Sequence, residues 1–356
     1  MNRRRVLFID DDQRILEGIA RLLRPKRTQV EVLTAVGGAE ALTILAREQI
    51  DVVISDMRMP QMDGAQLLAE VRRLRPQIVR IILSGQSDRE TILRAVGPAH
   101  QFLSKPCDPE ILTATVLRSC ALRDLLADEG RQRDIAAMSS LPCAPTALAA
   151  LRSGLLDASL TPDQAAALMV ADLGLSAKVL QLTTTSFFGT PRNLMSPHEA
   201  AMCLGPDILR SLAEGDAAFP AGTDDAALVA ASRTARRRSS VARELASGLS
   251  SSLAAAEIAG LLCGCGSLLP AGQPGSEAPG CHGAAFLAGL WGLPDQIVEA
   301  ILRSACPSRI RGEHDRLAAI VHASAALVDG ITLDREFCET QGVSHQLLAS
   351  TKASAG

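Results

Sequence analysis

The chain has 356 residues, which is long enough for two or three domains with sizeable cores. Hydrophobic residues make up 47% of it, so the chain is globular rather than disordered. Aromatic residues make up only 2%, which argues against stacking platforms for single-stranded nucleic acid, and the net charge of −3 gives no general attraction to nucleic acid or anionic lipid.

The pattern of hydrophobic residues predicts no leader peptide and no membrane segment. The arginines at positions 3–5 run into four apolar residues and then three aspartates, so no signal-peptide core follows them. The longest weakly polar run, residues 258–271, is short and broken by glycine and proline. Nine cysteines at irregular spacings, without a secretion signal, indicate reduced thiols in a cytoplasmic protein.

The first 120 residues predict five consecutive βα units. Short apolar runs, each typical of a buried strand, alternate with segments of helical periodicity. The predicted strands are residues 6–9, 30–33, 50–55, 78–83 and 100–103, and the predicted helices are residues 15–23, 39–48, 65–74, 89–96 and a fifth that begins near Pro109. This pattern favours an α/β fold, a flavodoxin-like doubly wound parallel sheet of strand order 2-1-3-4-5.

Chemically active side chains follow four of these strands. Asp10 and Asp11 follow the first strand, Asp56 the third, Ser84 the fourth and Lys105 the fifth. In the expected order these strands are neighbours, and ligands of such sheets bind at the carboxyl ends of the strands, so the five side chains should converge. Three carboxylates in one pocket repel one another unless a cation lies among them, and Mg²⁺ is the cation that accepts a few carboxylates and phosphate oxygens.

Five separated motifs resemble the receiver domain of two-component response regulators. They agree with that family in order, spacing and chemistry, and they cover about residues 4–120. The motifs are Ile9-Asp10-Asp11, Ser55-Asp56-Met57-Arg58-Met59-Pro60, Asp63-Gly64, Leu83-Ser84-Gly85 and Lys105-Pro106.

The resemblance implies a role for each motif. Asp56 would be the nucleophile that accepts a phosphoryl group from a sensor histidine kinase, and Lys105 would pair with the phosphoryl oxygens. Mg²⁺ would be bound by Asp11, Asp56 and the main-chain carbonyl of Arg58, with Asp10 acting mostly through a metal-bound water. The bond between Lys105 and Pro106 is expected to be cis. Ser84 would be the switch hydroxyl, and Phe102 the aromatic residue that repacks on phosphorylation.

Residues 121–138 are expected to connect two modules. Apolar positions at helical spacing run from Pro109 to Ala137, but residues 127–134 are almost entirely charged or polar. We expect a solvated continuation of the fifth helix that ends before Leu141. Such a helix could transmit a shift or form the seam of a homodimer, and a plain linker is the alternative.

From Ser139 onward the pattern predicts an all-α module. Thr161 is the expected N-cap of one helix, with Pro162 at its first position. Residues 139–330 resemble the HDOD domain, a helical output module of bacterial signalling proteins, and depart from it at Leu173 and Thr184. The motifs are Leu141-Pro142 with Pro145, residues 172–180, residues 187–191, Glu199-Ala200-Ala201 and Leu204-Gly205. Residues 331–356 form a tail whose last part should fray.

The competing hypothesis for this module is a metal-dependent HD-GYP-type cyclic di-GMP phosphodiesterase. Such an enzyme needs several histidines and an adjacent His-Asp pair to hold metals that activate water. Cys263-Gly264-Cys265-Gly266 stands where the pair would be expected, and residues 199–281 contain no histidine. His314-Asp315 is an adjacent pair, but it falls at an expected helix start. A DNA-binding transcription factor is a third hypothesis, but the sequence contains no recognisable helix-turn-helix.

Two further sequence features leave alternatives open. Cys263, Cys265, Cys281 and His282 could bind zinc or could be buried packing residues. A run of arginines between residues 233 and 243 is typical of a solvated helix face, with an acidic partner or nucleic acid as the minority interpretation. The resulting hypothesis is a response regulator that uses Mg²⁺, is phosphorylated on Asp56, and controls a non-catalytic output module with an unidentified protein partner.

Overall fold

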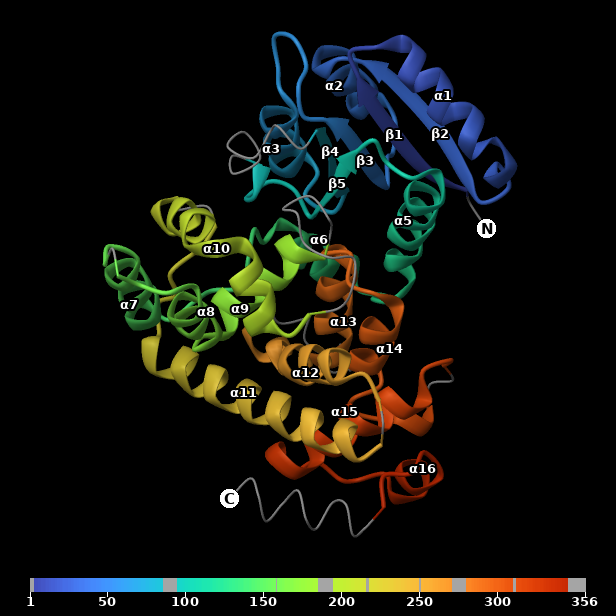
Figure 1. Cartoon of the computed structure of the whole chain (residues 1–356). Coiled ribbons are helices and arrows are strands. Elements are labelled where there is room, and N and C mark those ends of the chain that lie inside the picture. The colour runs from blue at the N-terminus through green and yellow to red at the C-terminus, as the bar shows by residue number, and fades with distance from the viewer. Residues whose placement is uncertain are drawn as a thin grey trace.

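The computed structural model describes residues 3–85, 95–157, 159–184, 195–215, 218–249, 251–270, 280–309 and 312–344. Most of the helix expected at residues 89–96, the motif at residues 187–191 and the end of the tail lie outside these ranges. Figure 1 shows a sheet-containing N-terminal module above a helical module that begins near residue 139.

The N-terminal module is the expected doubly wound parallel sheet. Its five strands lie in the order β2-β1-β3-β4-β5, which confirms the predicted fold class. The strands are β1 (Arg4–Asp10), β2 (Val30–Val36), β3 (Val52–Asp56), β4 (Val79–Gly85) and β5 (Gln101–Lys105), and the described helices are α1 (Gln13–Leu23), α2 (Gly38–Arg47), α3 (Gly64–Leu74) and α5 (Pro109–Ala121). All of β3 is buried, as its unbroken apolar run indicated. The fifth strand begins one residue later than expected and extends to Lys105.

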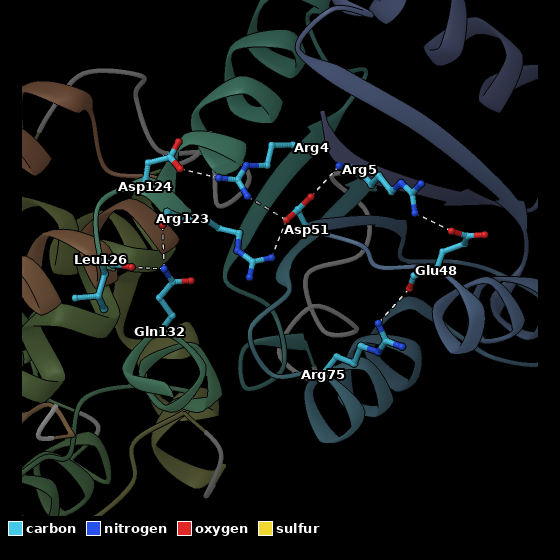
Figure 2. Close-up of polar contacts among 9 residues, drawn as sticks. All are labelled: Arg4, Arg5, Glu48, Asp51, Arg75, Arg123, Asp124, Leu126 and Gln132. Atoms are coloured by element: carbon cyan, nitrogen blue, oxygen red, sulfur yellow. Dashed lines mark hydrogen bonds and ion pairs between the residues drawn. The ribbon is translucent and has the colours of Figure 1, made fainter. Parts of the chain in front are cut away.

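The connector at residues 121–138 is folded, so the prediction of a solvated continuous helix was wrong. The chain leaves α5 through a 3-10 turn (Leu122–Asp124) and starts a new helix, α6 (Glu129–Ala137), with Asp128 as its N-cap. Gln132 is buried, and its amide donates hydrogen bonds to the carbonyls of Arg123 and Leu126, as Figure 2 shows. These carbonyls lie where the helix breaks and would otherwise lack partners, so the polar side chain stabilises the break.

Charged side chains attach the start of the connector to the sheet. Arg123 donates to Asp51 at 2.7 Å, and the same carboxylate accepts from the main-chain N–H of Arg5 at 2.8 Å. Arg4 reaches Asp124 at 2.6 Å (Figure 2). The connector is therefore fixed to the end of the sheet at which β1 and β3 begin.

The helical module contains ten described α-helices, and two of them pack against the connector or the N-terminal module. Thr161 caps α8 with Pro162 in the first turn, as predicted. Long α11 packs against α12 and α15. The helices are α7 (Pro145–Leu155), α8 (Pro162–Val170), α9 (Leu173–Thr183), α10 (Pro197–Glu214), α11 (Asp225–Gly248), α12 (Leu253–Leu262), α13 (Gly280–Leu290), α14 (Asp295–Leu302), α15 (Asp315–Asp329) and α16 (Arg335–Thr340).

Small residues on α13 allow the connector to approach closely. A Cβ atom placed on Gly289 would lie 2.1 Å from Leu122, and one placed on Gly283 would lie 3.0 Å from Arg131. Helix α13 therefore packs against the connector, and α9 packs against β5 of the N-terminal module. One continuous hydrophobic core runs through the two modules.

Within the described residues, no single helix combines the length and hydrophobicity needed to cross a membrane. Helices α8 and α9 would reach that length together, but they are bent by 117° relative to each other. None of the nine cysteines forms a disulfide.

Candidate functional site

Three carboxylates meet at the carboxyl ends of β1 and β3. Asp10 ends β1 and is 3% exposed, Asp56 ends β3 and is 8% exposed, and Asp11 follows β1 and is exposed. Each offers an oxygen within 4.8 Å of an oxygen of the other two. The strands place these side chains together because β1 and β3 are parallel neighbours in register.

Lys105 lies between two of the carboxylates. Its Nζ is 2.6 Å from Asp56 Oδ1 and 2.8 Å from Asp10 Oδ2. Burial lowers the pKa of this lysine, but its hydrogen bonds to Asp10 and Asp56 outweigh that effect and raise the pKa above its ordinary value. The ammonium is therefore charged at neutral pH and neutralises part of the pocket.

Burial raises the pKa of the Asp56 carboxyl, Lys105 opposes this, and the negative charge of Asp10 adds to it. Asp56 is thus a carboxylate that lacks full solvation and depends on a nearby cation. A carboxylate in that condition is a better nucleophile and ligand than one fully hydrated at the surface.

The loop after β3 brings the chain close to Asp56. The N–H of Gly64 donates to the Met57 carbonyl at 2.9 Å, and a Cβ atom at position 64 would lie 2.3 Å from the Asp56 carbonyl oxygen. Only glycine fits at this distance. Asp63 then caps α3 in a reciprocal capping box with Gln66, which fixes the loop on its other side.

The structure also places the other predicted site residues. Ser84 is 1% exposed on β4, where it is paired in register with Ser104 of β5, and Phe102 is 1% exposed on β5 beside Ile82. The Lys105–Pro106 bond is cis, as expected. Arg58 is exposed in the loop two residues after Asp56, and the role of its carbonyl as a metal ligand stays a prediction.

The donor set fits Mg²⁺. All three acidic groups offer the hard oxygen ligands that this ion prefers, and one of them, Asp11, is open to solvent, so bound water can complete the coordination. In the part of the chain that the structure describes, this is the only group of three or more acidic, histidine or cysteine side chains whose ligand atoms lie within 4.8 Å of one another.

Cys263, Cys265, Cys281 and His282 form no such group. Burial raises the pKa of Cys263 and of Cys265 to about 12, so both are neutral thiols in this structure. Cys281 Sγ lies 3.6 Å from the Nδ1 atom of His282.

An arginine occupies the place where a His-Asp pair would be expected. Nε of Arg238 lies 2.6 Å from Asp329, and a Cβ atom at Gly264 would lie 1.3 Å from Nη1 of the same guanidinium. A cation that cannot act as a metal ligand therefore fills the space next to Gly264. His314 is at the start of α15, as predicted.

Sequence reasoning missed a buried polar network between the two modules. Arg80 is fully buried near the start of β4, and its guanidinium donates to the carbonyls of Pro98 at 2.6 Å, Pro76 at 2.7 Å and Ala136 at 2.7 Å. His100, just before β5, accepts the Arg80 main-chain N–H at Nδ1, and its Nε2 lies 3.0 Å from the same Ala136 carbonyl.

Helix α9 of the helical module completes this network. Lys178 is fully buried, and its Nζ donates to the Ser139 carbonyl at 2.7 Å and to the Gln181 side chain at 2.7 Å. Gln181 in turn donates to the His100 carbonyl at 3.0 Å. The available signal was Lys178 itself, the only charged residue in an otherwise uncharged helix whose side chains are all buried.

A parallel five-stranded sheet whose strand ends hold an acidic cluster and a lysine defines the receiver class of signalling domains. Two comparisons extend this. Residues 6–117 match the family model of the response regulator receiver domain, and residues 141–273 match that of the HDOD domain. The chain therefore contains a response-regulator receiver domain followed by an HDOD domain.

Curated relatives are similar over part of their length. The hydrogenase transcriptional regulatory protein HoxA of Cupriavidus necator is 36% identical over 35% of this chain and 26% of that protein. GlrR, a transcriptional regulatory protein of Escherichia coli, is 40% identical over 30% of this chain and 24% of its own length. The response regulator PleD of Caulobacter vibrioides is 36% identical, and the aligned part is 36% of this chain and 29% of PleD. The chain thus spans about a quarter of the length of the curated relatives it matches.

Solved receiver domains align with about a third of the chain. The receiver domain of an HD domain-containing protein from Pseudomonas fluorescens is 34% identical, with 33% of this chain and 94% of that chain covered and a TM-score of 0.31. A response regulator receiver domain protein from Clostridium thermocellum is also 34% identical, with coverages of 34% and 98% and a TM-score of 0.32.

Proposed function

We propose that Asp56 accepts a phosphoryl group from a sensor histidine kinase in the presence of Mg²⁺, and that the HDOD module reads the result without catalysing a reaction itself. The observation that carries this proposal is the pocket in which Lys105 lies within 2.8 Å of both Asp10 and Asp56, with Asp11 beside them.

Asp10, Asp11 and Asp56 are the side chains that would hold the metal, with the Arg58 carbonyl as a further ligand. When bound, Mg²⁺ supplies positive charge that neutralises the carboxylates and the oxygens of an incoming phosphoryl group. Phosphoryl transfer depends mainly on positioning and charge neutralisation, so no further catalytic group is required.

In the transfer step, an Asp56 oxygen forms a bond to phosphorus while the bond between phosphorus and the kinase imidazole nitrogen breaks. The imidazole leaves with the electron pair of that bond and gains its proton from solvent. Lys105 then exchanges part of its contact with Asp56 for the new phosphoryl oxygens, which carry more charge than the carboxylate alone.

Strand β5 links this chemistry to the HDOD module. Ser84 would turn toward the phosphoryl group, and Phe102 would repack into the space it leaves. The neighbour of Phe102 is Gln101, whose amide donates to the Leu290 carbonyl of α13 at 3.0 Å. A shift of β5 therefore acts directly on a contact between the two modules.

The non-catalytic part of the proposal is supported by the geometry around Gly264. A phosphodiesterase of the HD type needs metal ligands there, and Arg238 paired with Asp329 occupies the space. We expect purified protein to leave cyclic di-GMP intact with or without added divalent metal, and hydrolysis that is lost on chelation would contradict this.

The test of phosphorylation uses the full chain with acetyl phosphate and Mg²⁺. We expect a mass increase of one phosphoryl group on the peptide that contains Asp56, its absence without Mg²⁺, and its loss in Asp56→Asn. Asp124→Asn is the matched control, because that carboxylate is exposed and bonds only to Arg4 in the connector region. A wild-type chain that gains no phosphoryl group, and no beryllofluoride adduct, would overturn the proposal.

A further inference from the structure

One face of α11 is lined with arginines and opens into a pocket. Arg233, Arg236, Arg237, Ser240 and Arg243 recur at helical spacings of three and four residues, which places them on one side of the helix. The arginines on this side are exposed to solvent, as the sequence indicated, and they also form a wall of a hollow of about 790 Å³.

The opposite walls come from four other helices. Val170 of α8, Ser176 of α9, His198 of α10 and Glu257 of α12 all line the hollow. The pocket is separate from the Arg238–Asp329 pair. Arg238 follows Arg237 in the sequence, but the turn of the helix places it on the side of α11 that faces away from the pocket.

Positive charge exceeds negative charge in this pocket. Four arginines line it against one carboxylate, Glu257, which pairs with Arg243 at 3.3 Å. His198 is satisfied by Asp163 at 2.9 Å. Neither Arg233 nor Arg236, both exposed, has an ion-pair partner among the described residues. In a chain of net charge −3, this is a local concentration of cations.

The size and lining of the pocket indicate the class of ligand. The volume lies within the range of about 300–1,000 Å³ that is typical of small-molecule sites. Phe, Tyr and Trp are absent from the residues that line it, so recognition must rest on charge and hydrogen bonds rather than stacking. The arginine stripe spans residues 233–243, about 15 Å of helix, which suits a compact anion better than a polymer that tracks an extended basic surface.

We propose that this pocket of the HDOD module binds a small molecule that carries two or more phosphate groups. Arginine is suited to this role because its planar guanidinium donates paired hydrogen bonds to phosphate oxygens. The site shares no residue with the Asp56 pocket and would give the output module a second, diffusible input.

The experiment measures binding of inorganic tripolyphosphate and of ADP to the full chain by titration calorimetry at low salt. The double variant R233A/R236A should weaken the binding of tripolyphosphate about tenfold or more, since two charge-assisted contacts are removed. Glu257→Gln should tighten it several-fold, because the change removes the one carboxylate in the pocket and releases Arg243. A folding defect could not produce that gain.

The matched control is R21A/R47A, which removes the same charge from exposed positions of α1 and α2. It should bind both ligands as the wild type does. The proposal is overturned if neither ligand binds at millimolar concentration or if the two double variants weaken binding equally. It is also overturned if a short duplex DNA binds at lower concentration than tripolyphosphate and loses this binding in R233A/R236A, because the surface would then be a nucleic-acid site.

Discussion

At one end of the receiver sheet lie the carboxylates of Asp10, Asp11 and Asp56, and at the other end lie the basic side chains of Arg80, Lys178 and His100. The acidic end is open to solvent through Asp11 and contains one neutralising lysine. The basic end is sealed by the HDOD module, and among the described residues Arg80 and Lys178 have no carboxylate partner: they donate to main-chain carbonyls and to Gln181.

The difference teaches how each end responds to change. Charges that are stabilised by exchangeable partners, such as a metal ion or Lys105, can be rearranged at small cost. Charges that are stabilised by fixed carbonyls in a buried seam cannot lose a partner without leaving another group unsatisfied. The acidic end is thus suited to chemistry and the basic end to joining the modules.

The largest expected effect comes from removing Arg80. Arg80→Ala leaves the carbonyls of Pro76 and Pro98 without the Arg80 donor in a buried seam, and the Ala136 carbonyl keeps only its contact with His100. We expect the free energy of unfolding, measured in urea, to fall by about 3–5 kcal/mol.

Arg75→Ala is the matched control for Arg80, because this half-buried arginine makes one hydrogen bond, to the Glu48 carbonyl, as Figure 2 shows. We expect it to cost no more than about 1 kcal/mol. If Arg80→Ala and Arg75→Ala lower the free energy of unfolding by the same amount, the hydrogen bonds of the buried seam contribute no more to stability than one at the surface.

The next effect is a dependence of stability on pH from Lys178. Burial, helped by the charge of Arg72, lowers the pKa of Lys178 to about 7. Between that value and its ordinary pKa of 10.5 the unfolded chain binds the extra proton, so stability should rise with pH across this window and be lowest below pH 7.

Lys178→Met should remove this contribution, which amounts to about 1.4 kcal/mol per pH unit in the middle of the window. The measurement is the slope of urea-unfolding free energy between pH 7 and 9, compared with that of the wild type, because the unfolded thiols that ionise in this range do so in both proteins. Lys26→Met, a partly exposed position, should keep the wild-type slope. An unchanged slope in Lys178→Met would show that this lysine stays charged in the seam.

At the acidic end, removing the lysine should strengthen metal binding. Lys105→Met leaves Asp10 and Asp56 without the ammonium that now neutralises them. We expect Mg²⁺ to bind roughly tenfold more tightly, about 1.4 kcal/mol, as measured by calorimetry. Asp11→Asn should weaken Mg²⁺ binding, because it removes one of the carboxylates. If Lys105→Met also weakens Mg²⁺ binding, the role of the lysine is to position the ligands and not only to compete with the metal.

The smallest expected effect is at Gln101. Gln101→Ala removes the hydrogen bonds to the Gly289 and Leu290 carbonyls and should cost about 1 kcal/mol in urea unfolding. Gln13→Ala, at an exposed position of α1, should cost less than about 0.5 kcal/mol. A negligible effect of Gln101→Ala would show that the contact between β5 and α13 does not stabilise the two modules.

The acidic end was predictable because its residues are identified by local sequence. Each polar residue directly follows an apolar run, and the parallel strand order then brings Asp10, Asp56 and Lys105 together without any further information. The strand order and the N-cap at Thr161 followed from equally local patterns.

The basic end and the connector were not predictable in the same way. Gln132 reads as a surface residue because its neighbours are charged, yet it is buried and bonded to carbonyls that only the break after α5 leaves free. Arg80 lies within an apolar strand, and its partner carbonyl at Ala136 is 56 residues away. Pairings of this kind depend on how the modules dock, which periodicity does not encode.

The docking of the connector also determines how this chain could be recombined with its relatives. Arg72 and Arg80 of the receiver donate to the carbonyls of Ala137 and Ala136, so the structural unit that contains the sheet extends well past the last residue of α5. A hybrid protein joined at residue 120 would separate these arginines from the chain with which they pair. The junction that respects the observed contacts lies after Ser139, and even there the incoming output domain must supply a buried amine for the Ser139 carbonyl.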